Sequence, residues 1–258
     1  MEKKESLKLP VNKTLARSEL ESFSILIHGM PKIGKSTFCS NAENTLFLAT
    51  EPGLNSLDVY QLPIKDWPSL MDACGLIASG DHKYKTIVID TIDNAYKLCQ
   101  AYICSKYKID HESDMGWGKG HAFVNNEFQR AINKMIAMPY GLYMISHSQA
   151  REIETRTSKH TKIVPTLPDK VGKIITGMVD MILFCDLEIV KDDSGNDISR
   201  RVLRTTPNIY FEAGNRLGLS PVIDLDYGKF KEDFIATMKR RAVKGETKSS
   251  QKKTEKKS

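Results

Sequence analysis

The sequence predicts an α/β fold in which a mostly parallel sheet is flanked by helices. Four short apolar runs alternate with segments of helical periodicity, the pattern of strands and helices in a parallel sheet. A glycine-rich loop joins the first run to the first helix, and near the C-terminal end an alternating segment broken by turn residues indicates an antiparallel hairpin. At 258 residues the chain is long enough for one substantial core.

The first half supplies three strands and three helices. The helices are expected to begin near Lys35, to cover 69–79, and to run from Ile92, where apolar residues recur at helical spacing, to about Tyr107. Pro52 and Gly53 end the second strand. The expected strands are 23–28, 45–50 and 86–90.

The second half continues the alternation and ends in the hairpin. Three glycines and a tryptophan in 111–120 interrupt the pattern before a helix with apolar positions from Phe123 to Ile136. The polar, basic segment 150–162 indicates an exposed loop or a flexible hairpin. The remaining expected elements are a strand at 141–146, a helix at 169–178 and a hairpin of 180–190 with 198–205.

Charge and composition divide the chain into a leader at 1–22, a folded domain at 23–238 and a tail at 239–258. The leader is polar, with a short helical tendency near 18–22. The tail has nine basic and two acidic residues and no aromatic residue, so it carries more than the net charge of +6 and leaves the rest of the chain nearly neutral. Such a composition predicts disorder, either as a solubilising end or as a nonspecific arm for nucleic acid.

Cysteine spacing and hydropathy exclude several classes. The five cysteines show no CxxC or Cys/His metal spacing, so we expect neither a disulfide nor a zinc site. No apolar run approaches the roughly 20 residues of a membrane-spanning helix. The N-terminal segment also lacks the apolar stretch of a signal peptide, which predicts a cytoplasmic location without membrane contact.

The loop after the first strand matches the phosphate-binding pattern G-x-x-x-x-G-K-[ST], with a strand before it and a helix after it. Its glycines let backbone N–H groups converge on a phosphate, and the helix N-terminus adds a positive dipole. Lys35 is expected to reach the β- and γ-phosphates of ATP, and the Ser36 hydroxyl to bind Mg²⁺. The residues assigned to nucleotide binding are Gly29, Lys32, Gly34, Lys35, Ser36 and Thr37.

Asp90 ends the apolar run of the third strand. A carboxylate at that edge of a parallel sheet, beside a phosphate-binding loop, is placed to hold Mg²⁺ through water. The alternative is an aspartate that caps the following helix.

Hydrolysis needs a group that orients or deprotonates the attacking water. Thr91 follows Asp90 where many AAA-type ATPases have a glutamate, so we assign this role to Glu51 at the end of the second strand. At the end of the next strand, His147 is the candidate that senses the γ-phosphate, with Gln149 as the alternate. The competing interpretations are a surface turn glutamate for Glu51 and a loop-stabilising histidine for His147.

The motifs GMPKIGKST, FLATEPG, IVIDT and MISHSQ, in this order, resemble the phage-encoded RecA-like P-loop ATPases of the AAA_24 type, including the Sak-group single-strand annealing and recombination proteins. The resemblance covers roughly 23–219. It implies that a strand-end glutamate activates water and that the strand after Asp90 ends in a phosphate sensor, which match Glu51 and His147. Where the RecA pattern has Asn-Gln, this chain has Ser146-His147.

The resemblance also implies that the segment after the sensor faces single-stranded DNA. That segment is basic but lacks the aromatic residues that stack on bases, so a solvated loop is the alternative. Its basic residues are Arg151, Arg156, Lys159, His160 and Lys162. Arg204 on the hairpin and Arg216 resemble the arginines that such proteins offer to the ATP of a neighbouring subunit, with Arg216 the chosen candidate. Lys170 and Lys173 are weaker candidates for the same role.

The expected function is therefore ATP binding and hydrolysis with Mg²⁺ in DNA recombination, single-strand annealing or repair, in the host cytoplasm if the protein is phage-encoded. The expected partners are single-stranded DNA, further copies of the chain and a replication or recombination protein. The alternative is a nucleotide-dependent switch or scaffold that recruits a replication partner without binding DNA.

Overall fold

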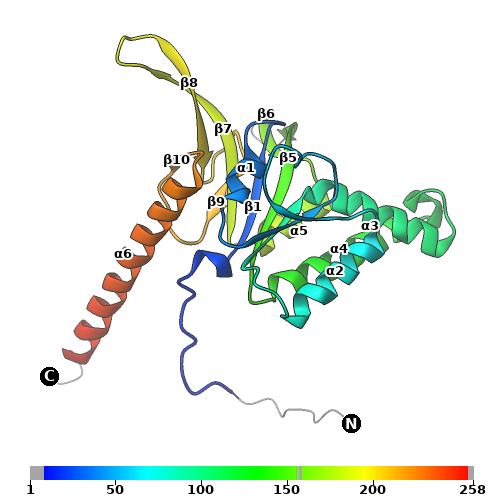
Figure 1. The fold of residues 1–258 in the computed structure, drawn as a ribbon, viewed down its shortest axis with the longest axis horizontal. Helices are drawn as coiled ribbons and strands as arrows, with labels where there is room; N and C mark the ends of the chain where they lie inside the picture. The colour runs from blue at the N-terminus through cyan, green and yellow to red at the C-terminus, as the bar shows by residue number, and fades with distance from the viewer. Residues whose placement is uncertain (1–8, 155, 157–158, 255–258) are drawn as a thin grey trace.

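The computed structural model describes residues 9–254 except 155, 157 and 158, and it describes the side chains of the last helix as far as Val243. A single sheet lies at the centre of the fold (Figure 1). Its strands are arranged in the order β10-β8-β7-β1-β5-β4-β2-β3, with β6 paired to β5 and β9 paired to β7. The strands are β1 (Ser24–Gly29), β2 (Thr45–Ala49), β3 (Tyr60–Pro63), β4 (Thr86–Asp90), β5 (Gly141–Glu154), β6 (Lys159–Pro165), β7 (Met181–Lys191), β8 (Asp197–Arg204), β9 (Gly214–Asn215) and β10 (Val222–Asp224).

The strands from β3 to β7 along this order pair in parallel, and β7, β8 and β10 pair antiparallel. β1 is central, because β5 pairs with one of its edges and β7 with the other. The predicted fold class, a mostly parallel sheet flanked by helices with a C-terminal antiparallel hairpin, is confirmed.

Helices cover both faces of the sheet and divide the core in two. On one face, α2, α3, α4 and α5 pack their apolar sides against the strands. On the other face lie α1, the start of α6 and Leu20 from the leader. The helices are α1 (Lys35–Ser40), α2 (Trp67–Ser79), α3 (Ile92–Tyr107), α4 (Lys119–Ile136), α5 (Asp169–Met178) and α6 (Tyr227–Thr254), with 3-10 turns at η1 (Leu20–Ser22) and η2 (Glu112–Met115).

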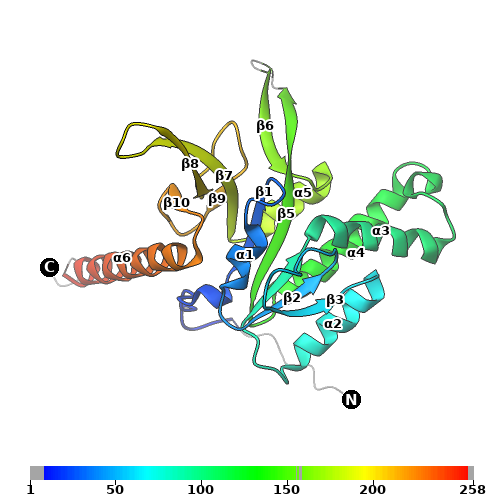
Figure 2. The same cartoon turned by 45° about the horizontal axis from the view of Figure 1, so that its top comes forward.

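One element near the sheet edges was missed from the sequence, and another decides between two predicted alternatives. β3 was missed because its four residues are all exposed on an edge strand, so no apolar run marks it. The segment 150–162, for which a loop was one alternative, is the hairpin: β5 extends to Glu154 and pairs antiparallel with β6. Figure 2 shows the β5–β6 arm and the β7–β8 arm rising from the same edge of the sheet.

The C-terminal tail is the main correction. The sequence predicted disorder from Lys239, but α6 continues without a break from Tyr227 to Thr254 and projects away from the sheet (Figure 1). Phe230 and Phe234 anchor its first turns in the core. Once a helix is anchored, each further residue adds a hydrogen bond at little entropic cost, so a segment that cannot fold alone continues as helix.

Two further sequence expectations concern cysteines and membranes. All five cysteines are buried and free. Within the described residues, no helix is both long and apolar enough to cross a membrane.

Gly29, the last residue of β1, lies against β7 so closely that a side chain has no room. A Cβ there would lie 2.7 Å from the Cys185 carbonyl oxygen and 2.8 Å from its Cβ. We expect Gly29→Ala to lower the free energy of unfolding by about 1–3 kcal/mol, as overpacking does, measured by urea denaturation. Gly75→Ala in the middle of α2 meets open space and should instead raise stability by about 0.5–1 kcal/mol. A Gly29→Ala protein as stable as wild type would contradict this.

Candidate functional site

The loop between β1 and α1 adopts the conformation that a phosphate-binding loop requires. Gly34 has φ 117°, a left-handed conformation that glycine adopts without strain, and α1 starts at the next residue. A Cβ on Gly34 would also lie 3.2 Å from an Arg201 guanidinium nitrogen, so β8 closes the outer side of the loop. The loop therefore bends tightly, with the first N–H groups of α1 free of intrahelical partners.

Lys35 occupies the centre of this loop. Its side chain is buried, and its Nζ donates 2.9 Å hydrogen bonds to the carbonyl oxygens of Gly29 and Met30. Burial lowers the pKa of the Lys35 ammonium, and the nearby Asp90 is among the groups that act in the opposite direction. An ammonium held by two loop carbonyls is placed to exchange one of them for a phosphate oxygen.

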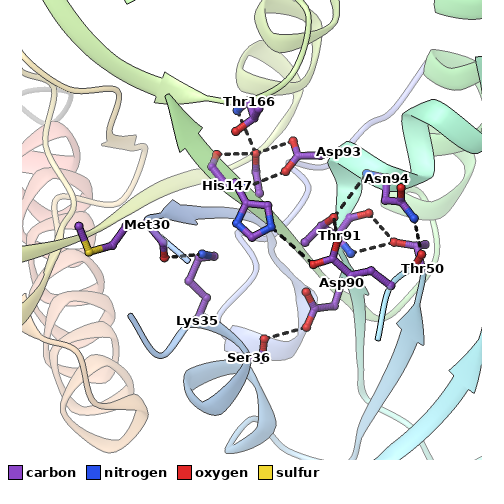
Figure 3. Close-up of polar contacts among 12 residues, drawn as sticks. Met30, Lys35, Ser36, Thr50, Asp90, Thr91, Asp93, Asn94, His147 and Thr166 are labelled. Atoms are coloured by element: carbon purple, nitrogen blue, oxygen red, sulfur yellow. Dashed lines mark hydrogen bonds and ion pairs between the residues drawn. The ribbon is translucent and has the colours of Figure 1, made fainter. Parts of the chain in front are cut away.

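Ser36 and Asp90 face each other across the loop and the end of β4. The Ser36 hydroxyl donates to Asp90 Oδ2 at 2.7 Å, and burial raises the pKa of the Asp90 carboxyl (Figure 3). A hydroxyl and a buried carboxylate are oxygen ligands of the type Mg²⁺ prefers, and a cation would offset the cost of burying the carboxylate charge. The pair therefore fits a Mg²⁺ site.

The helix-cap alternative for Asp90 is not what the structure has. The N-cap of α3 is Thr91, whose hydroxyl oxygen accepts from the Asn94 N–H at 3.4 Å. The Asp90 side chain points instead to Ser36, at 2.7 Å.

Glu51 and His147 meet on the other side of the same cleft. His147 Nε2 lies 3.5 Å from Glu51 Oε1, and the Thr91 hydroxyl donates to Glu51 Oε2 at 3.3 Å. The other ring nitrogen of His147, Nδ1, is buried without a hydrogen-bond partner among the described residues. An unsatisfied buried polar atom is costly, so this nitrogen is an exception among the polar groups around the cleft.

These groups surround one pocket of about 460 Å³. Its wall also includes Ser56 and Leu57 from the segment after β2, which sequence reasoning did not single out. The lining residues are Pro31, Lys32, Gly34, Lys35, Ser36, Thr37, Glu51, Pro52, Gly53, Ser56, Leu57, Asp90, Thr91, Ile145 and His147. Of the residues that the sequence placed in nucleotide binding, metal binding and water activation, Gly29 alone is not in the lining, and its carbonyl binds Lys35.

The arginine and lysine candidates lie elsewhere in the chain. Arg216 follows β9, which pairs with the start of β7, so it lies at the sheet edge opposite the phosphate loop. Its guanidinium donates to the Gly177 carbonyl at 3.0 Å. Arg204 is engaged in a 2.6 Å ion pair with Asp186 on the β7–β8 arm. A single copy of the chain therefore does not bring either arginine to the pocket.

The other secondary candidates are placed as follows. Gln149 lies beside Met30 in a separate groove between the two arms. Lys170 and Lys173 are exposed on α5, away from the pocket lining.

Sequence reasoning missed the residues that hold the strand ends in place. The backbone of Thr91 exchanges two hydrogen bonds with the Thr50 hydroxyl, and the Asn94 amide donates to the Thr50 carbonyl. The Asp93 carboxylate accepts from the backbone N–H of His147 in β5. Their only sequence signal is polar character in the first turn of a helix, which capping alone explains. His28 was also missed: it is fully buried before the loop, and desolvation lowers the pKa of its imidazole to about 4.

A phosphate-binding loop, a serine–aspartate pair and a strand-end carboxylate, all at the carboxyl edge of parallel strands, are the features of a P-loop nucleotide-binding protein. The profile of the AAA_24 family, an AAA domain, matches residues 21–217, and the chain belongs to this family.

Comparisons with known proteins and solved structures give two matches. The chain is 24% identical over 193 residues to the SPbeta prophage-derived protein YorG of Bacillus subtilis strain 168, a match that covers 72% of this chain and 56% of YorG. The chain thus spans little more than half the length of that relative. The solved structure of the flagellar accessory protein FlaH from Methanocaldococcus jannaschii aligns with a TM-score of 0.40 at 14% identity, over 79% of this chain and 84% of FlaH.

Proposed function

We propose that the chain is a Mg²⁺-dependent ATPase that acts on single-stranded DNA in phage recombination, annealing or repair. The ATPase proposal rests on one observation: a single pocket is lined both by groups suited to bind phosphate and Mg²⁺ and by groups suited to orient water. Lys35, Ser36 and Asp90 provide charge and oxygen ligands, and Glu51 with His147 provides a carboxylate–imidazole pair 3.5 Å apart.

Each group has a distinct role in phosphoryl transfer to water. Lys35 binds the β- and γ-phosphates, and Ser36 with Asp90 would hold Mg²⁺, which when bound neutralises phosphate charge. Glu51 accepts a hydrogen bond from the attacking water and orients it. His147, which lines the pocket beside Glu51, is the proposed sensor of the terminal phosphate.

None of the described residues in the pocket lining is an arginine. An arginine finger contributes about 10³–10⁵ in rate in phosphoryl-transfer enzymes, so a neighbouring copy in a homo-oligomer would supply it. Arg216, with a side chain 62% exposed, remains the candidate.

The proposed contact with single-stranded DNA involves the β5–β6 arm and the basic C-terminal segment. β5 runs directly from His147 into the β5–β6 arm, so one strand joins the arm to the proposed phosphate sensor. Three basic residues of the arm are in ion pairs, Arg151 with Asp169, Lys159 with Glu152 and Lys162 with Glu212, so the arm offers less free charge than its sequence suggests. The sequence 239–258 supplies nine basic and two acidic residues. YorG, a prophage-derived relative, supports a phage setting.

We expect the ATPase rate to rise with single-stranded DNA, and we expect truncation before Lys239 to weaken DNA binding about equally for all sequences. The truncation keeps Phe230 and Phe234, the anchors of α6, so the domain should stay folded. Each phosphate contact that is lost lowers the log–log salt slope by about 0.7 for a single strand. The measurement is ATPase rate and DNA affinity for both proteins at low and moderate salt.

Lys97→Gln, which removes one exposed lysine from α3, is the control for a generic charge effect. Stimulation that survives truncation places recognition in the folded domain. If DNA binding disappears when the tail is removed, the tail acts only as a nonspecific polycation and the folded domain does not recognise DNA. If neither protein binds or responds to DNA, the DNA role fails and a nucleotide-dependent switch takes its place.

A further inference from the structure

The first turn of α3 contacts two chain segments on either side of β4, the residue that follows β2 and the middle of β5. On the β2 side, the Thr50 hydroxyl donates to the Thr91 carbonyl at 2.8 Å, and the Asn94 amide donates to the Thr50 carbonyl. On the β5 side, the contact is made by the Asp93 carboxylate. One short segment therefore contacts Thr50, the residue before Glu51, and the part of β5 that carries His147 (Figure 3).

The Asp93 carboxylate accepts two hydrogen bonds from adjacent residues of β5. Oδ2 accepts from the His147 backbone N–H at 2.7 Å, and Oδ1 accepts from the Ser146 hydroxyl at 2.7 Å. The Ser146 oxygen in turn accepts from the Thr166 N–H at 3.3 Å. Both donors to Asp93 are fixed, because Ser146 is fully buried and the His147 donor belongs to the backbone.

The sheet itself does not hold His147 on this side. Pairing between β4 and β5 ends at Asp90 opposite Ile145, two residues before His147. On the other side, β1 still pairs with β5 at Gly29 opposite His147. The Asp93 carboxylate thus accepts the His147 N–H in the position where a residue of β4 would otherwise pair with β5.

We propose that Asp93 is a positioning residue that holds β5 at Ser146 and His147 so that the His147 imidazole faces Glu51 and the pocket. The inference rests on the proposed ATPase function, since it assigns Asp93 a part in that reaction through His147. A carboxylate suits the role because two donors point at it. An asparagine of the same size offers one acceptor oxygen, so Asp93→Asn leaves one of the two donors facing an amide NH₂.

The test is a double-mutant cycle on the full-length protein with Asp93→Asn, His147→Ala and the two combined. Each protein is measured for steady-state turnover and for ATP dissociation constant. We expect Asp93→Asn to lower kcat about 10-fold or more, because small misplacements of a site group are that costly, and to change the dissociation constant less than about two-fold. If Asp93 acts through His147, the double variant is no slower than His147→Ala alone. Asp72→Asn, an exposed aspartate on α2, is the matched control and should match wild type.

Additive losses in the cycle would overturn the inference, and so would unchanged kcat in Asp93→Asn or in His147→Ala. Absence of turnover in wild-type protein, with or without DNA, would count against the proposed function instead. If thermal unfolding shows that the Asp93→Asn protein is not folded, Ser146→Ala replaces Asp93→Asn in the cycle. Ser146→Ala removes the Ser146 hydrogen bond to Asp93 and leaves the hydrogen bond from the His147 N–H. A smaller loss of kcat that is likewise non-additive with His147→Ala is then expected, and an unchanged kcat overturns the inference.

Discussion

Lys35→Ala is expected to abolish tight nucleotide binding while the fold stays intact. The ammonium donates two 2.9 Å hydrogen bonds to loop carbonyls that phosphate oxygens would replace, and no other lysine in the pocket is buried. Hydrogen bonds to charged groups are worth about 1.5–3 kcal/mol each, so the loss of two weakens ATP binding by roughly 10²–10⁴-fold. The measurement is the ATP dissociation constant by calorimetry.

The fold should tolerate this change because Lys35 lines the pocket and belongs to neither of the two hydrophobic cores. Thermal unfolding therefore serves as the check on structure, and Lys97→Ala on the exposed side of α3 is the matched lysine control. An affinity close to that of wild type would remove the loop from the proposed site.

For Glu51→Gln, ATP should remain bound while turnover falls by about 10²–10⁴-fold, the usual contribution of a group that accepts a proton or orients water. The amide has the same size and can still accept from the Thr91 hydroxyl, which lies 3.3 Å from Glu51 Oε2. The substitution removes the negative charge that faces the attacking water and leaves Lys35, Ser36 and Asp90 in place. Oligomers with bound ATP should accumulate.

Single-turnover hydrolysis and ATP binding, measured on the same preparation, separate the two effects. Glu232→Gln is the control, an exposed glutamate on α6 outside the pocket lining. Unchanged hydrolysis in Glu51→Gln would transfer the water-activating role to another carboxylate, with Asp93 and Asp90 the nearest alternatives.

The parts of the fold and site that the sequence predicted are those set by local patterns. Buried parallel strands read as apolar runs, and the ends of neighbouring strands must meet at one edge. For this reason Asp90, Glu51 and His147 could be named from strand positions alone, and the structure brings their side chains to one pocket. The glycine pattern located the loop in the same way, because the conformation of Gly34 is one that few other residues adopt.

The rest depends on contacts between segments far apart in sequence. Asp93 looks like any acidic residue in a helix first turn, and only the register of β4 and β5 makes it the partner of His147. β3 has no apolar signal because it is an exposed edge strand. The helix beyond Lys239 follows from the anchoring of its start at Phe230, which composition does not reveal.

The position of Gly29 has a mechanical consequence. It pairs with His147 on one side and Cys185 on the other, and from these two residues β5 and β7 continue into the two arms. At roughly 3.3 Å per residue, each arm extends about 20 Å beyond this point. A change of about 10° in strand twist at Gly29 would therefore move an arm tip by roughly 3–4 Å, enough to break or make a hydrogen bond there. A small adjustment around the phosphate loop would in this way be amplified into a displacement at the far ends of both hairpins.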